Sequence, residues 1–167
     1  MKENYKGIFK ISKTPNSDGK YEVSSTKDVE VINRNITSLT NGMFIWVNVI
    51  EDFICSYCYS LETLEGAPEK VGRDFDCSCC ESLKNLKGAP EKVGENFICY
   101  TCKSLESLEG APEKVGRNFI CYTCKSLKTL KGAPKEVGKD FNCRLCKIKF
   151  TADDVKKVSN VKGEIMC

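Results

Sequence analysis

Apolar and polar residues in the middle of the chain follow one pattern that recurs without insertion or deletion. The first four copies read Phe-x-Cys-x-x-Cys-x-Ser-Leu-x-x-Leu-x-Gly-Ala-Pro, followed after two residues by Val-Gly. A phenylalanine opens each copy at intervals of 22 residues: Phe53, Phe75, Phe97, Phe119 and Phe141. A fixed period of this length is typical of a solenoid, in which each short unit buries its apolar side chains against its neighbours.

Each copy begins with a period-two run of β-forming residues, such as Phe119-Ile120-Cys121-Tyr122. This alternation predicts one short strand per rung, with Phe and the first Cys pointing inward. The rest of the copy has an apolar residue at every third position and ends in Gly-Ala-Pro, and the proline excludes a regular helix there. The sequence therefore predicts a mainly β solenoid with an extended arc between strands.

The pattern resembles the leucine-rich-repeat family, whose units read Leu-x-x-Leu-x-Leu-x-x-(Asn/Cys)-x-Leu before a variable arc. The matching positions of one copy are Phe119 and Cys121 for strand leucines, Cys124 for the Asn/Cys position, and Leu127 and Leu130 for the arc. The spacing after Cys124 is similar to that of the cysteine-containing subtype, and short near-identical repeats of this kind resemble those of bacterial, phage and mobile-element proteins. The resemblance implies a solenoid whose concave strand face binds a protein.

The two ends of the chain depart from the repeat. Residues 1–48 contain two β-rich runs around Pro15-Asn16-Ser17-Asp18-Gly19, which predicts a β-hairpin at the N-terminal cap. Residues 49–150 form the repeat array of five rungs. In residues 151–167, Thr151 precedes an acidic and then a basic stretch, which predicts a short helix in a C-terminal cap.

Ten of the twelve cysteines fall in two columns of the repeat, and Cys79 and Cys167 lie outside them. The repeat itself explains both columns, because the first packs inward as a small apolar side chain and the second occupies the Asn/Cys position. We therefore expect reduced structural thiols and no bound metal or cofactor. Zinc held by paired Cys-x-x-Cys units and a disulfide ladder stay open as alternatives.

Charge and residue usage narrow the function further. The 167-residue chain carries 26 basic and 23 acidic residues, which gives a net charge of +3. This near balance does not favour nucleic acid as the principal ligand, because nucleic-acid-binding proteins usually carry a strongly basic surface. It contains no His and no nucleophile or phosphate-loop motif, so we expect no catalytic residues and no enzymatic activity. The N-terminus has no apolar signal core and no apolar run reaches membrane-spanning length, which favours a cytoplasmic protein without a membrane partner.

Acidic and basic residues alternate between rungs at the two positions that flank the second leucine. Stacking would place opposite charges beside each other, which penalises a slip by one rung. The positions are Glu62 and Glu65, Lys84 and Lys87, Glu106 and Glu109, and Lys128 and Lys131. We interpret this alternation as control of register rather than as a binding surface.

The predicted binding surface consists of the strand residues that point away from the core. Its centre is an Ile and Tyr stripe over adjacent rungs, and Tyr and Arg are enriched where proteins bind one another. The residues are Ile54, Ser56, Asp76, Ile98, Tyr100, Ile120, Tyr122, Asn142 and Arg144. The alternatives are that the N-terminal hairpin folds over this stripe or that a second copy of the chain covers it.

The sequence thus favours a non-enzymatic module that grips a protein partner through the concave face of its repeats. With a phage or mobile-element source, one specific version is an inhibitor of a bacterial defence enzyme, similar to the anti-CRISPR proteins. The competing class is a zinc or redox protein that uses the stacked Cys-x-x-Cys columns.

Overall fold

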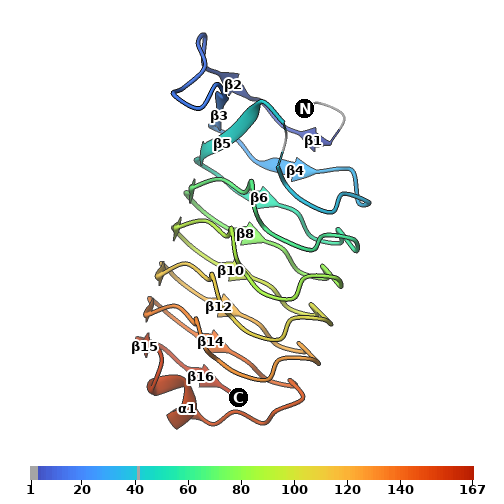
Figure 1. The fold of residues 1–167 in the computed structure, drawn as a ribbon. Coiled ribbons are helices and arrows are strands. Elements are labelled where there is room, and N and C mark those ends of the chain that lie inside the picture. Colours follow the sequence, from blue (N-terminus) through green and yellow to red (C-terminus); the bar gives the residue numbers. More distant parts are fainter. Residues whose placement is uncertain (1–3, 41) are drawn as a thin grey trace.

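The computed structural model describes residues 4–40 and 42–167 and shows a β-solenoid of about seven turns (Figure 1). One strand of each turn joins a sheet that we call the Phe sheet, because its central strands begin at the repeat phenylalanines. Its strands, in spatial order, are β1 (Tyr5–Lys6), β4 (Val29–Val31), β6 (Phe53–Ile54), β8 (Phe75–Asp76), β10 (Phe97–Ile98), β12 (Phe119–Ile120), β14 (Phe141–Asn142) and β16 (Ile165–Met166). All neighbours pair in parallel except β1, which is antiparallel to β4.

A second sheet, the Val sheet, contains the repeat valine of each turn. Its order is β15 (Asn160–Val161), β13 (Glu136–Val137), β11 (Lys114–Val115), β9 (Lys92–Val93), β7 (Lys70–Val71), β5 (Phe44–Val49), β3 (Tyr21–Ser25) and β2 (Lys10–Ile11). The predicted mainly β solenoid with 22-residue rungs is confirmed, and the structure adds this second ladder, where the sequence predicted only an extended arc. In residues 53–150 the arcs between the two sheets contain no helix.

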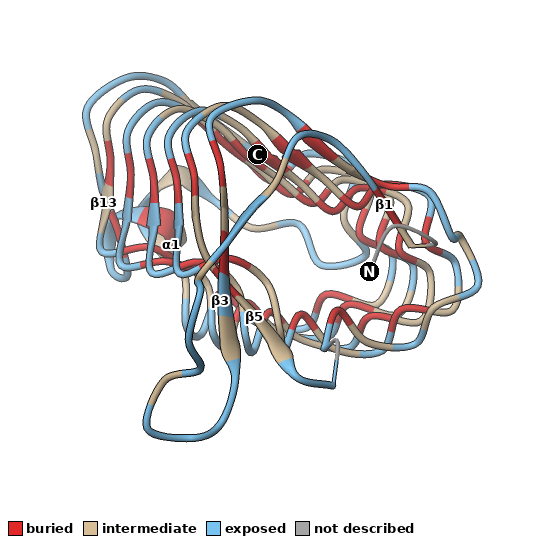
Figure 2. Cartoon of the chain, turned by 90° about the horizontal axis from the view of Figure 1, so that it is seen from above, coloured by how far each residue is buried: buried red, intermediate tan, exposed pale blue. Residues whose placement is uncertain are grey.

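The core runs between the two sheets as stacked columns of identical side chains. Phe53, Phe75, Phe97, Phe119 and Phe141 are fully buried, and successive ring centroids lie 5.1–5.7 Å apart. Figure 2 shows the buried segments repeating in the same place on every rung. Since parallel in-register pairing brings like residues to one strand spacing, the repeat sequence generates the column directly.

A ladder of Asp and Asn side chains ties the corner before each Phe strand to the next rung. The side-chain oxygen of Asp74 accepts the backbone N–H of Asn96 at 2.9 Å, and that of Asn96 accepts the N–H of Asn118 at 3.2 Å. Asp52 and Asn118 continue the same bond in either direction. Backbone donors at the corner, which have no strand partner, are thereby satisfied.

The predicted caps at the two ends are confirmed. At the N-terminal end β2 and β3 form the hairpin, while Tyr5 and Trp46 pack on Phe53 with Trp46 5.8 Å from the Phe53 ring. At the C-terminal end Thr151 caps α1 (Ala152–Lys156), whose Val155 is fully buried. After α1 the chain makes one more turn through β15 and β16, which the sequence did not predict. No helix in the described residues is long and apolar enough to cross a membrane.

Candidate functional site

The outward face of the Phe sheet presents the predicted stripe. Phe97 and Cys99 are fully buried, while Ile98 and Tyr100 are partly exposed, so the in-and-out alternation read from the sequence is confirmed. Parallel register places Ile98 beside Ile120. We use the name "outward face" for the side of the Phe sheet on which these side chains lie.

Tyr100 and Tyr122 form a stacked aromatic pair on the outward face. Their ring centroids lie 5.0 Å apart and the ring planes differ by 6°, so the two phenols are stacked. Each side chain is partly exposed. The two rings therefore form a continuous aromatic surface, and the sequence predicted that they lie side by side.

Two of the predicted residues have little side chain to offer a partner. The exposed fraction of Ser56 is 6%. The residue lies beside Arg34, whose guanidinium donates to the Ser56 carbonyl at 2.6 Å. The exposed fraction of Asn142 is 9%, and its side-chain oxygen accepts the backbone N–H of Arg144 at 3.2 Å. The expectation that both lie open on this face is wrong, because neighbouring side chains and backbone cover them.

The remaining predicted residues keep accessible atoms. Ile54, Asp76 and Ile120 are partly exposed, and Arg144 is exposed. Asp76 is held in place because its Oδ1 accepts the backbone N–H of Ser78 at 2.8 Å and the Ser78 hydroxyl at 2.5 Å. Ser78 itself is fully buried, so it acts as a support for Asp76 rather than as a contact.

Sequence reasoning missed the aromatic edge of this face. Tyr57 and Tyr59 are 46% and 50% exposed and their rings meet edge to face at 6.3 Å. Tyr57 adopts a left-handed backbone with φ of 61°, as do the equivalent residues of the next four rungs. The Tyr100 phenol, and then the Cys79 thiol, raise the pKa of the Tyr57 phenol. The sequence feature that could have revealed this edge is the pair Tyr57 and Tyr59 on either side of Cys58.

The N-terminal hairpin does not cover the outward face. Its strands β2 and β3 extend the Val sheet, and β3 pairs with β5. In Figure 2 the loop between them projects away from the Phe sheet. The alternative in which this hairpin is a lid over the stripe is therefore wrong.

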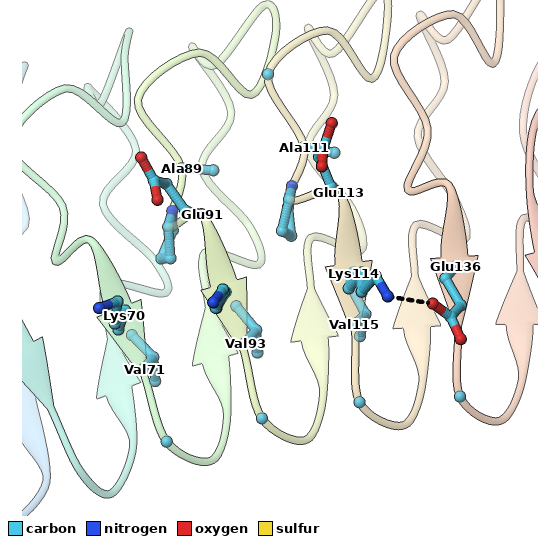
Figure 3. Close-up of a pocket in the computed structure, with 18 of the residues that line it drawn as sticks. Lys70, Val71, Ala89, Glu91, Val93, Ala111, Glu113, Lys114, Val115 and Glu136 are labelled. Atoms are coloured by element: carbon cyan, nitrogen blue, oxygen red, sulfur yellow. Dashed lines mark ion pairs between the residues drawn. The ribbon is translucent and has the colours of Figure 1, made fainter.

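A groove of about 920 Å³ lies over the Val sheet instead, where no binding residue was predicted. It is lined by alanine, proline, valine and glycine of successive rungs together with lysine and glutamate side chains (Figure 3). Lys114 pairs with Glu136 at 2.8 Å, and Lys162 reaches the same carboxylate at 3.2 Å. Lysines and glutamates alternate around the groove, so no single charge dominates it.

The cysteine columns have the structural positions that the sequence predicted. The second-column thiols donate to the carbonyl of the first-column cysteine one rung earlier, for example Cys102 to Cys77 at 3.3 Å and Cys124 to Cys99 at 3.2 Å. Burial raises the pKa of the Cys124 thiol to about 12 and that of Cys99 well above its usual range. The raised pKa values keep these thiols protonated at neutral pH in the metal-free protein.

Alanine at Cys99 or Cys121 is expected to lower the free energy of unfolding by roughly 1 kcal/mol each, because a small buried side chain is lost. The measurement is urea denaturation of reduced protein. A strong chelator is expected to leave the melting temperature of the parent protein unchanged. A large drop with chelator would establish a structural metal and favour the zinc alternative.

The charge alternation on the arc forms ion pairs in the later rungs. Lys128 lies 3.0 Å from Glu106, Lys131 lies 2.8 Å from Glu109, and Lys87 lies 3.9 Å from Glu109. Lys131 lowers the pKa of the Glu109 carboxyl. Within the described residues, Glu62 and Glu65 are not paired within 4.0 Å. The register role is thus supported for three of the rungs, with small energies because the pairs are solvated.

Comparison of the chain with models of protein families, with curated proteins and with solved structures finds no match.

Proposed function

We propose that this chain is a non-enzymatic protein-binding module and that the outward face of the Phe sheet is its binding surface. The observation that carries the proposal is the stacked pair of Tyr100 and Tyr122 beside the Ile98 and Ile120 pair. Exposed tyrosine next to branched aliphatic side chains is the composition of interface hot spots.

Rigidity of the surface supports the same proposal. The side chains stand on parallel rungs whose Phe neighbours are fully buried, so little conformational entropy is lost when a partner binds. Asp76, fixed by Ser78, and the exposed Arg144 add polar groups at either end of the apolar centre. An apolar centre with charged ends is the usual arrangement of a specific protein interface.

The resemblance to cysteine-type leucine-rich repeats supports a more specific version of this proposal. In that version the chain comes from a phage or mobile element, acts in the bacterial cytoplasm, and inhibits a host defence enzyme by binding it. The absence of a catalytic constellation in the sequence agrees with inhibition by binding rather than by chemistry.

Combined alanine substitution of Tyr100 and Tyr122 is expected to weaken partner binding by about 2 kcal/mol or more, roughly 30-fold. The fold is expected to survive, since only ring stacking worth roughly 0.5 to 1.5 kcal/mol is lost. The measurement is affinity capture from a bacterial lysate with mass spectrometry, followed by titration of the captured protein against both forms.

The matched control is combined alanine substitution of Lys70 and Lys92, which lie on the Val sheet. This control is expected to retain the captured protein at unchanged affinity. Binding that survives loss of both tyrosines but fails in the lysine control would move the interface to the groove over the Val sheet.

A further inference from the structure

We infer that the partner fitted by the outward face is a second copy of this chain, packed face to face with its rungs in reverse order. This inference rests on the proposed function, because it names the occupant of the same surface. It comes from the order in which charged and apolar residues follow one another from β6 to β16.

The outward residues of successive Phe-sheet strands read almost the same in both directions. Parallel register sets the order of the strands as β6, β8, β10, β12, β14 and β16. The first outward residue of each, in that order, is Ile54, Asp76, Ile98, Ile120, Asn142 and Met166. The centre of this series lies between β10 and β12.

Consider a two-fold axis that passes through this centre, runs parallel to the strands and lies midway between two copies. It reverses the order of the rungs in the second copy. Residues at the same position along their strands, which form one column, then lie opposite the same column of the other copy. Such an axis generates an isologous interface, in which residue i meets residue j and j meets i. The facing pairs are then Ile98 with Ile120, Tyr100 with Tyr122, Ile54 with Met166, and Asp76 with the rung that carries Asn142 and Arg144. Apolar residues meet apolar residues. On either side of the centre Asp76 faces Asn142 in its own column, and the long Arg144 side chain, two residues farther along that strand, lies diagonally opposite Asp76.

Asp76 and Arg144 each have unused capacity for this contact. Only Oδ1 of Asp76 accepts hydrogen bonds from described residues, and its Oδ2 accepts none. Arg144 donates through Nε to Asn142 at 3.4 Å, and within the described residues it has no carboxylate within 4.0 Å. Three strand spacings separate the two residues within one chain, about 14 Å, so they cannot pair with each other there. Packed against a second copy, both are neutralised.

The size of the strip sets the expected strength. Five strand spacings from β6 to β16 give a length of roughly 24 Å, and the strip is only two side-chain columns wide. This places the contact in the small class of interfaces, which associate weakly and reversibly. We therefore expect a dimer that forms as the protein concentration rises and that weakens with salt, because of its two ion pairs.

The test is sedimentation velocity of reduced protein over a series of concentrations from about 1 μM to about 1 mM, the range in which small interfaces associate. The parent chain is expected to shift from monomer to dimer across this range. Asp76→Arg and Arg144→Asp are each expected to weaken dimerisation about tenfold or more, because two attractive contacts become two like-charge contacts. Circular dichroism of each variant checks that the fold is retained.

Charge complementation separates an interface role from a structural one. A protein carrying both substitutions is expected to dimerise again, since the facing charges are merely exchanged. An equimolar mixture of the two single variants is expected to form a mixed dimer, because each Arg of one chain then faces an Asp of the other. If the single substitutions acted only by breaking the hydrogen bonds between Ser78 and Asp76, neither the double variant nor the mixture would regain dimerisation.

A parent chain that stays monomeric at the highest concentration, or single variants that dimerise like the parent, would overturn the inference. The proposed function fails separately. If the chain is monomeric but captures a protein in a manner that depends on Tyr100 and Tyr122, the outward face binds a different protein and only the inference is lost. If it is monomeric and capture does not depend on these tyrosines, both are lost.

Discussion

Alanine in place of Phe97 or Phe119 is expected to lower the free energy of unfolding by roughly 3 to 5 kcal/mol for each substitution. Both rings are fully buried, and they lie 5.4 Å apart in the middle of the phenylalanine column. Phe97 also stacks on Phe75 at 5.3 Å, so its removal opens a cavity between two rungs. Because each rung is stabilised through its neighbours, a central cavity weakens both halves of the array. Urea denaturation followed by circular dichroism measures the loss.

The outward neighbours are the matched controls. Ile98 and Ile120 follow these phenylalanines in the same strands but are partly exposed. Alanine at either one is expected to cost about 1 kcal/mol, since only part of the side chain leaves water on folding. Equal losses at Phe97 and Ile98 would contradict the assignment of inward and outward sides on which the binding surface depends.

Periodicity was sufficient to predict the Phe sheet, but it could not reveal the Val sheet. Strands of both sheets are two residues long in the repeats, but Phe97–Ile98 opens an alternating run that continues through Cys99 and Tyr100. The Val-sheet strand Lys92–Val93 has no alternating run around it, so only its hydrogen bonds to the rungs on either side reveal it. The hydrogen bond between Asp74 and Asn96 could not be predicted from local sequence either, because the two residues are 22 positions apart.

The last turn was hidden by a change of spacing. Ile165 pairs with Phe141, and Cys167 lies beside Cys143 with 3.4 Å between the two sulfur atoms. Insertion of α1 lengthens this turn, so a search at a fixed period of 22 does not reach Ile165. Cys167, which the repeat left unexplained, thus belongs to the first cysteine column.

Prediction of the site was limited by contacts between rungs of different sequence. Tyr100 and Tyr122 were found because identical neighbouring rungs place identical residues together. Ser56 was misjudged because Arg34, from the irregular N-terminal turn, lies beside it. Tyr57 was missed because its left-handed backbone redirects a residue that strand alternation would have turned inward.

Alanine in place of Gly94 or Gly116 is expected to destabilise the solenoid at least as severely as a small-to-large change in a packed core, by roughly 3 kcal/mol or more. A Cβ at Gly94 would lie 2.0 Å from the carbonyl oxygen of Gly72, and one at Gly116 would lie 1.8 Å from that of Gly94. The obstructing atom is backbone of the preceding rung, and the Gly94 N–H itself donates to the Val71 carbonyl of that rung at 3.0 Å. Relief of the clash therefore requires that the Val sheet separate between two rungs.

Thermal unfolding of the Gly94→Ala protein measures this effect, and Gly19→Ala in the hairpin turn is its control. Gly19 has open space around a Cβ but a left-handed φ of 72°, so alanine there is expected to cost only about 1 to 2 kcal/mol of local strain. At Gly94 the backbone lies outside the left-handed region, and its larger loss would come from the clash alone. A Gly94→Ala protein as stable as the Gly19→Ala protein would show that the rungs do not stack in this register. The strand order that separates Asp76 from Arg144 on the outward face, on which the proposed dimer depends, would then be wrong as well.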